Sequence, residues 1–347
     1  MATRTSQFHL PNPSTGAQEI HHFETEVGQV VGLKEKFRQP STAYTVGKIA
    51  YHNALSMQKL VCVKAGTTAS GNVTPSTTEG ALITDGTVTW QVDSLADGNY
   101  TAIHQNDIGG SRDITAYWES GIMSTNIQAG IFVGMHIGDY IIKSVTIDGT
   151  TYSNVKHILM DFDYHLHCGD TETTAHHVAI MPESNLGNAQ MNTEHTTAGG
   201  YLGSEMWTEH MPKVAAGFEA AFGAAHILEH RELLSNAMDA NLKSNAYDSW
   251  SGAASDWAWA SVKVNLANEN MVYGAPVLSS SSFDTGECNS QLAAFRLNHG
   301  LICSKRYWWW LRSVAYASNF CDVSTLGLAN ASAAAASGGV RPIALLR

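Results

Sequence analysis

The chain has 347 residues, of which 15% are charged, and it carries a formal net charge of −11. This length allows one large domain or two domains, and the low charge with abundant small residues is typical of a β-rich chain. The acidic balance and the absence of a Lys/Arg cluster exclude a nucleic-acid-binding surface, since neutralising phosphates requires a basic patch.

Cysteine spacing and targeting signals indicate the compartment in which the chain is made. The five cysteines are scattered, odd in number and without a C-x-x-C pair, so no disulfide framework is expected. The first residues lack the apolar core of a secretory signal, and no apolar stretch reaches membrane-spanning length. We therefore expect that the protein is made in the cytosol and does not insert into a membrane. It would reach the outside of the cell only as a component of a particle.

Residues 1–40 are polar and contain two turn-like Pro tripeptides, Asn12-Pro13-Ser14 and Gln39-Pro40-Ser41. This composition indicates an attachment segment or a flexible arm.

Residues 41–95 are predicted to form a small all-β module, because β-prone runs alternate with stretches rich in Gly, Ser and Thr. The segment resembles small modules of phage tail and fibre proteins, some of which bind carbohydrate. Tyr44 and Trp90 could stack on a sugar, or they could anchor the core of the module.

Residues 96–135 are predicted to be a helical connector. Apolar residues at roughly helical spacing predict one helix over Asp113–Ile127, with Ser111 or Asp113 as its cap.

Residues 136–347 are predicted to form a larger α+β domain. Asp148-Gly149 marks the turn of a hairpin over residues 139–152. Amphipathic spacing predicts one helix over residues 204–222 and a second over residues 225–238. Further strands are expected at residues 155–164, 176–182, 262–266, 271–273 and 307–311.

The stretch of residues 314–339 has an unusual composition. It contains no Lys, Glu, Gln, Met or Trp, although these types supply 57 of the 347 residues. Such a gap arises by chance at about the one per cent level if positions are independent. Codons that end in a pyrimidine cannot encode these five types. The stretch is therefore either a surface whose side chains are free to vary or a low-complexity Ala/Ser loop.

Eight ordered blocks in residues 134–347 resemble those of a known family. They read GDYI (138–141), HHVAIMPESNLGNAQMN (176–192), GGYLGSEMW (199–207), FGAAHILEHRELLSNA (222–237), MVYG (271–274), QLAAFRL (291–297), YWWWLRSV (307–314) and GVRP (339–342). This part of the chain resembles C-type-lectin-like phage and prophage proteins that end in a WLRS…GVRP frame, many of them targets of diversity-generating retroelements.

The resemblance implies a C-type-lectin-like domain preceded by the small all-β module. In such systems template AAY codons become NNY codons, and this mechanism would leave the compositional gap described above. The resemblance therefore implies a receptor-binding protein, or adhesin, at the tail fibre or tail tip of a virion. Its variable segment would be residues 314–339.

The expected ligand-binding residues point outward from this segment. They are Ala315, Tyr316, Asn319, Asp322, Ser324, Thr325, Leu326, Leu328, Asn330, Ser332, Ala333 and Ala334. The expected scaffold frame consists of Trp308, Trp309, Trp310, Arg312, Val340 and Arg341. The two arginines are expected to tie the segment to backbone carbonyls or carboxylates.

Phe320 and Val323 are apolar among polar neighbours and are expected to point inward. Tyr316 then becomes the one aromatic residue of the face. Because binding hot spots favour Tyr, Trp and Arg, each site is expected to bind weakly, and a homotrimer would supply avidity. The expected partners are a host cell-surface protein or glycan and other tail proteins.

Two groups have the residue types of a metal site. His226 and His230 are spaced i, i+4 on the second predicted helix, without the H-E-x-x-H pattern of metalloproteases. The second group would share one face of a strand and consists of Asp161, Asp163, His165 and His167, with Asp170 nearby. Calcium-binding lectins use a Glu-Pro-Asn type motif, which does not appear here. Neither a metal nor another cofactor is expected.

Other functions stay open as alternatives. The first is a tail or baseplate structural protein without diversification. The second is a lectin-fold enzyme, since sulfatase-activating enzymes of a related fold use paired cysteines near the C-terminus. Cys303 and Cys321 would be that pair, but their surroundings do not match, so no enzyme is expected.

Overall fold

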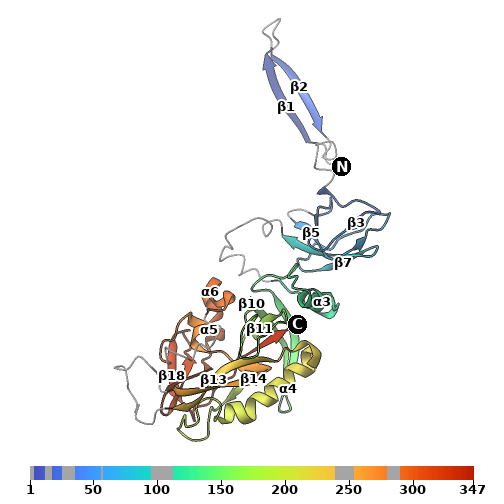
Figure 1. Ribbon diagram of the computed structural model, residues 1–347. Coiled ribbons are helices and arrows are strands. Elements are labelled where there is room, and N and C mark those ends of the chain that lie inside the picture. The colour runs from blue at the N-terminus through green and yellow to red at the C-terminus, as the bar shows by residue number, and fades with distance from the viewer. Residues whose placement is uncertain are drawn as a thin grey trace. The chain divides into compact units, whose positions relative to one another are not determined.

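The computed structural model describes residues 4–11, 18–25, 36–55, 58–94, 112–238, 254–279 and 290–347. The chain divides into two units, Met1–Gly98 and Asn99–Arg347, which are described separately below (Figure 1). Strands predominate and helices are present, so the fold class is α+β, as the sequence predicts. The predicted turn at Asn12-Pro13-Ser14 and the predicted cap Ser111 lie outside the described residues.

The first unit begins with two strands that the sequence did not predict. Strand β1 (Arg4–Pro11) pairs antiparallel with β2 (Gln18–Thr25).

A small sheet follows, with the strand order β4-β5-β8-β7. Its strands are β4 (Ile49–Ala50), β5 (Gln58–Lys64), β7 (Leu82–Asp85) and β8 (Val88–Ser94), and β3 (Ala43–Tyr44) pairs separately with β6 (Gly66–Thr67). Trp90 is fully buried in the core of this module, and its Nε1 donates to Asp85 over 3.0 Å. Tyr44 packs edge-on against it, with ring centroids 4.8 Å apart. Trp90 is therefore a core anchor and cannot stack on a sugar.

The connector helix of the second unit is broken in two. Helix α2 (Thr115–Glu119) and helix α3 (Ile122–Gln128) are separated by Gly121, whose φ is 71°. Gly adopts this left-handed conformation without the steric penalty of a side chain, and the first helix ends there. Asp113 accepts the backbone N–H of Thr115 over 2.9 Å, next to the start of α2.

The first large sheet has the strand order β15-β20-β11-β10-β9. Its strands are β9 (Tyr140–Ile147), β10 (Thr150–Phe162), β11 (Val178–Pro182), β15 (Val264–Leu266) and β20 (Pro342–Leu346). The predicted hairpin is confirmed, because Asp148 and Gly149 form its turn with φ of 49° and 78°. The last strand of the chain thus lies inside this sheet, between β15 and β11.

The first predicted amphipathic helix is also confirmed. A π-helical turn (η4, Met206–His210) leads into α4 (Met211–Phe222). Its apolar side packs on β9, where a Cβ at Gly217 would lie 2.5 Å from the Thr146 carbonyl oxygen. Glycine is needed here because the helix and strand backbones approach so closely.

The second predicted helix, over residues 225–238, is wrong. After a 3-10 turn (η5, Ala224–His226) the segment is strand β13 (His230–Met238), which pairs antiparallel with β14 (Ala254–Val262). His230, Glu232 and Leu234 are buried at alternate positions. Inward and outward side chains alternate as in any strand. Two of the inward side chains are polar, however, so the sequence does not show the alternation of apolar and polar residues that predicts a strand.

The predicted strand at residues 271–273 is wrong as well. The segment belongs to α5 (Glu269–Tyr273), where the side chain of Asn268 accepts the N–H of Met271 over 2.8 Å. Gly274 ends the helix with φ of 80°. The Asn cap and the Gly stop outweigh the β-prone residues between them.

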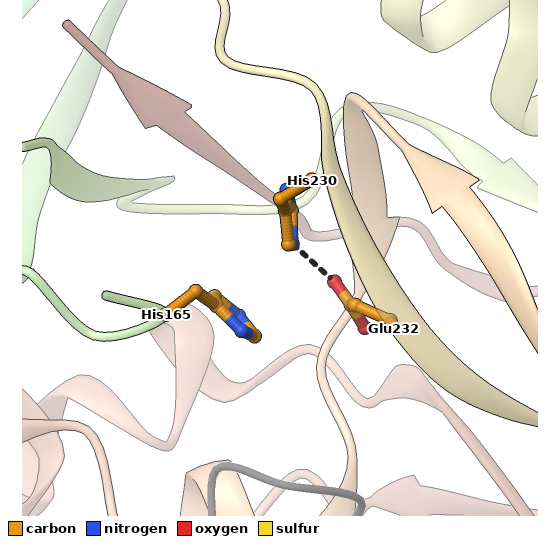
Figure 2. Close-up of side chains that lie close together, drawn as sticks. All are labelled: His165, His230 and Glu232. Carbon is orange, nitrogen blue, oxygen red and sulfur yellow. Dashed lines mark hydrogen bonds and ion pairs between the residues drawn. The ribbon is translucent and has the colours of Figure 1, made fainter. Parts of the chain in front are cut away.

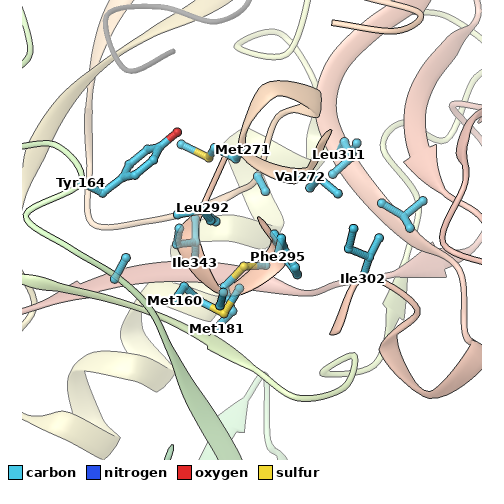
Figure 3. Packing of buried hydrophobic residues seen from close by; sticks show 14 of the residues in the cluster. Met160, Tyr164, Met181, Met271, Val272, Leu292, Phe295, Ile302, Leu311 and Ile343 are labelled. Carbon is cyan, nitrogen blue, oxygen red and sulfur yellow. The ribbon is translucent and has the colours of Figure 1, made fainter. Parts of the chain in front are cut away.

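The second large sheet has the order β12-β19-β16-β17-β18. Its strands are β12 (Asn188–Ala189), β16 (Trp309–Tyr316), β17 (Asn319–Val323), β18 (Ala329–Ala333) and β19 (Gly338–Gly339). Short helical elements precede it: α6 (Ala293–Leu297), η6 (His299–Leu301) and η7 (Ser304–Arg306). Apolar residues from both sheets, α5 and α6 form one core cluster, part of which Figure 3 shows around Met181, Phe295 and Leu311.

Cys168 is disulfide-bonded, while Cys62, Cys303 and Cys321 are not in disulfides. Within the described ranges, no helix has the length and apolar character needed to cross a membrane.

Candidate functional site

The segment predicted to vary forms a hairpin at one side of the second large sheet. Its base is closed, because β16, the strand that leads into it, pairs in parallel with β19 at Trp309 and Gly339. The N–H of Gly339 also donates to the carbonyl oxygen of Trp308 over 3.3 Å. Between these ends the chain runs out through β17 and back through β18, which is the edge strand of the sheet. The segment is therefore a hairpin whose base is held together by strand pairing.

Nine of the twelve residues predicted to bind ligand are at least partly exposed. We call them the hairpin face: Tyr316, Asn319, Ser324, Thr325, Leu326, Leu328, Asn330, Ser332 and Ala333. Leu326 and Leu328 are 66% and 63% exposed and are among the most exposed large apolar side chains of the described residues.

The other three predicted binding residues are buried, which corrects the prediction. Ala315 belongs to the core cluster. Asp322 is fully buried and accepts from the Nδ2 of Asn330 over 3.1 Å, and burial raises the pKa of its carboxyl. The carbonyl oxygen of Ala334 accepts the N–H groups of Met191 and Asn192. Neither a small side chain nor a polar one guarantees exposure, since tertiary contacts decide which residues of the hairpin are buried.

Phe320 and Val323 are fully buried, as their apolar character predicts. The backbone of β17 and β18 is paired from Asn319–Ala333 to Val323–Ala329. At the tip, the N–H of Ser324 donates to the Leu328 carbonyl oxygen over 2.9 Å. Because these bonds are between backbone groups, they do not depend on which side chains the face carries.

The tryptophans of the frame hold the base of the hairpin. Trp309 and Trp310 are fully buried, and their Nε1 atoms donate to the carbonyl oxygens of Ile302 and Ala189 over 3.0 and 2.9 Å. Trp308 packs edge-on against Trp310, with centroids 4.9 Å apart. Each buried indole N–H thus has a partner, as burial of a polar group requires.

The two frame arginines are buried and make contacts of the expected kind. Arg341 donates from Nε to the Pro182 carbonyl oxygen over 2.9 Å and from Nη1 to that of Leu301 over 2.7 Å. Burial lowers the pKa of its guanidinium to about 9. Arg312 pairs with the Glu232 carboxylate and donates to the Leu266 carbonyl oxygen over 3.3 Å. Together with Val340, which is also fully buried, these residues join the hairpin to the rest of the unit.

A second polar group lies inside the same unit, and it contains parts of both groups that have metal-site residue types. His165 and His230 lie with ring centroids 4.4 Å apart, and His230 Nε2 is 2.8 Å from Glu232 Oε1 (Figure 2). All three side chains are buried. We call these residues the His–His–Glu cluster.

The remaining members of the two groups lie apart from this cluster. His226 Nδ1 is 3.0 Å from Ser124 Oγ and from the carbonyl oxygen of Arg347, so it does not share a site with His230. Asp161 accepts the N–H of Ala293 over 2.9 Å, and Asp163 pairs with His176 over 2.7 Å.

His167 of the predicted strand-face group and the nearby Asp170 are at the surface. His167 pairs with Glu172, and Asp170 pairs with Arg231 over 2.8 Å. The four residues do not share one strand face because β10 ends at Phe162, and Asp163 and His167 have positive φ.

Sequence reasoning missed Glu232 as a member of the cluster. Its Oε2 is held by Arg312 and by the Nδ2 of Asn265, the latter over 3.2 Å. On a strand over residues 230–238, His230 and Glu232 share one face, because they are two residues apart. The prediction of a helix there did not bring these two side chains together.

A hollow of about 520 Å³ opens beside the cluster. Its wall includes His230, Glu172, Glu229 and Arg231. No residue of the hairpin face contributes to this wall. The hollow and the hairpin face are therefore separate features.

Comparisons with known proteins add one finding. A protein-family model described as a domain of unknown function (DUF6273) matches residues 236–347. No curated protein and no solved structure matches the chain. The matched region contains the hairpin face, its frame and the strands β14 to β20.

Proposed function

We propose that this chain is a phage tail receptor-binding protein that recognises a host-surface ligand through the hairpin face. The main support for the proposal is the hairpin of residues 314–339, which is held together at its base. The strand that leads into it meets its far end at Trp309 and Gly339, and nine side chains that are at least partly exposed lie between them on a backbone-bonded hairpin. Such an arrangement lets side chains change while the scaffold persists, which is what a diversified binding surface requires.

We further propose that the second unit has a C-type-lectin-like architecture. Two of the family-like blocks, residues 307–314 and 339–342, supply β16 and the β19–β20 region that support the hairpin. The compositional gap lies between these two blocks and thus coincides with the hairpin. The restricted residue set and the fold of the segment therefore support the same function.

The chemistry of the face suggests weak binding by each copy. Tyr316 is partly buried and is the one aromatic side chain on the face, while Leu326 and Leu328 supply exposed apolar area. Weak single sites gain strength when several copies bind one surface, so we propose a homotrimer within the virion tail that also contacts other tail proteins. The ligand would be a protein or glycan of the host cell surface.

The test is binding of the purified protein to a panel of bacterial surfaces. We expect the unmodified chain to bind at least one strain, and the double variant Leu326→Asp/Leu328→Asp to lose on the order of tenfold or more of that binding. Val277→Asp is the matched control, since Val277 is an exposed aliphatic residue of the same unit outside the face. Equal binding by the double variant and the control would rule out the hairpin face as the site.

A structural tail or baseplate protein without diversification is the second candidate, because the face carries few large anchor residues. The gene distinguishes the two. Diversification predicts pyrimidine-ending codons at the hairpin-face positions, a near-copy template repeat and a neighbouring reverse transcriptase gene. Codons without this bias, and no template repeat, would favour the structural role.

A further inference from the structure

We propose that the His–His–Glu cluster binds one divalent transition metal ion of the zinc type. A ring nitrogen of His165, a ring nitrogen of His230 and a carboxylate oxygen of Glu232 all lie within 4.8 Å of one another. Two imidazoles and one carboxylate form a known zinc ligand set, in which tetrahedral coordination spaces the ligand atoms roughly 3.4 Å apart. Modest side-chain movements close the remaining difference. Calcium and magnesium prefer oxygen ligands and fit this set poorly.

A metal ion of this type binds imidazole in its neutral form and carboxylate in its ionised form. Burial, followed by the neighbouring His230, lowers the pKa of His165 well below its usual value. Burial alone would raise the pKa of the Glu232 carboxyl, but the charge of Arg312 and the hydrogen bond from His230 outweigh it and hold that pKa well below its usual range.

Neighbouring groups orient the carboxylate. Arg312 and Asn265 hold Glu232 Oε2, which leaves Oε1 directed at His230. The Tyr201 hydroxyl in turn donates to Asn265 Oδ1 over 2.8 Å. Outer contacts of this kind fix the direction of a metal-binding carboxylate. Arg312 also brings a positive charge, so the ion must bind through Oε1 and leave the pair with Arg312 intact.

The cluster contains ring nitrogens that nothing else in the described chain satisfies. The Nδ1 atoms of His165 and His230 are buried and have no hydrogen-bond partner among the described residues. Buried polar atoms in proteins nearly always have a partner, so these two need an explanation. His230 faces Glu232 Oε1 through its other nitrogen, Nε2, so of these two atoms it is Nδ1 of His165 to which an ion bound at Oε1 could give a partner.

The hollow beside the cluster offers a route for the ion. His230 belongs to both the cluster and the wall of the hollow, whose volume is about 520 Å³. The carboxylates of Glu172 and Glu229 stand on that wall and would attract a cation. The opposing charge of Arg231 is paired with Asp170 over 2.8 Å.

A bound ion would link three separate parts of the second unit. His165 follows β10, His230 and Glu232 lie on β13, and Arg312 lies on β16, next to the hairpin. Because the ligands come from distant positions in the chain, the folded protein would bind the ion far better than the unfolded chain. Metal binding should therefore raise the temperature of unfolding.

The test begins with the full chain, stripped of metal with a chelator and titrated with Zn²⁺ and Co²⁺. We expect one ion per chain, visible Co²⁺ absorption of the tetrahedral type and a higher unfolding temperature in Zn²⁺. His165→Gln and His230→Gln should each weaken Zn²⁺ binding about tenfold or more. His195→Gln is the matched control, since His195 is an exposed histidine away from the cluster, and it should bind as the unmodified chain does.

Two results would overturn the proposal. One is the absence of Zn²⁺ binding by the unmodified chain at a clear excess of metal. The other is equal binding by the cluster variants and the control, which would assign the ion to surface histidines. If a variant fails to fold by circular dichroism, X-ray absorption of the Zn²⁺-loaded unmodified chain decides. Two imidazoles in the coordination shell support the site, and a shell without imidazole contradicts it.

Discussion

Buried polar residues at single positions fix much of this fold. Arg341 is fully buried against the stacked rings of Phe295 and Trp309, with its guanidinium carbon 5.5 and 5.1 Å from their centroids. It also donates to two backbone carbonyl oxygens. A buried charge is tolerated only with such partners, so Arg341 selects the one packing in which the last strand meets β11 and the η6 turn.

His157 makes stability depend on pH. Burial against Phe218 and Phe222 lowers the pKa of its imidazole to about 3. The unfolded chain takes up a proton near pH 6.5 and the folded chain does not, so stability is lost as pH falls below about 6.5. Between pH 8 and pH 5 this one group should remove about 2 kcal/mol from the free energy of unfolding.

Urea unfolding at several pH values checks this prediction. His157→Leu is close to His in volume and cannot titrate, so its stability should fall less steeply than that of the unmodified chain, by about 2 kcal/mol over the same range. His195→Leu, at an exposed position, should leave the slope unchanged. Parallel slopes for His157→Leu and the unmodified chain would show that His157 is not buried in its neutral form.

The base of the hairpin depends on close contact between elements. A Cβ at Gly338 in β19 would lie 2.4 Å from Trp308 Cζ3 and 2.6 Å from Trp310 Nε1. Gly338→Ala should therefore destabilise the chain by roughly 1–3 kcal/mol, the usual range for overpacking a core. Gly71→Ala is the control, because no atom lies within 4 Å of its added Cβ. A neutral Gly338→Ala in urea unfolding would show that the frame is not tightly packed.

Elements with a local signal could be predicted from the sequence, and those that depend on distant partners could not. Asp148-Gly149 specifies a hairpin turn by itself, and the apolar side of residues 204–222 specifies a helix. Strand β13 was missed because His230 and Glu232 face inward, and partners far away in sequence, such as Arg312 and His165, make that favourable. In the candidate site, the inward positions of Phe320 and Val323 could be predicted from their apolar character. The burial of Asp322 and Ala334 could not, because it depends on tertiary contacts.

The molecule as a whole consists of two units with separate cores. One core surrounds Trp90 in the first unit, and the other joins both large sheets of the second. A fragment of residues 99–347 should therefore unfold in one cooperative transition, with a midpoint within about 4 °C of that transition in the full chain. Calorimetry of the fragment and the full chain measures this. A fragment without a cooperative transition would show that the second unit depends on the first.

The central claim is that the hairpin face can change its side chains, and with them its ligand, while the fold persists. The most direct measurement is a library in which the nine hairpin-face positions carry pyrimidine-ending codons, assayed for folding and for binding to the panel of bacterial surfaces. We predict that most members stay folded, with changes within about 0.5 kcal/mol per substitution, whereas Phe320→Ala costs about 3–5 kcal/mol. We also predict that members differ in the surfaces they bind. A library whose members mostly unfold, or that all bind the same surfaces as the unmodified chain, would contradict the claim.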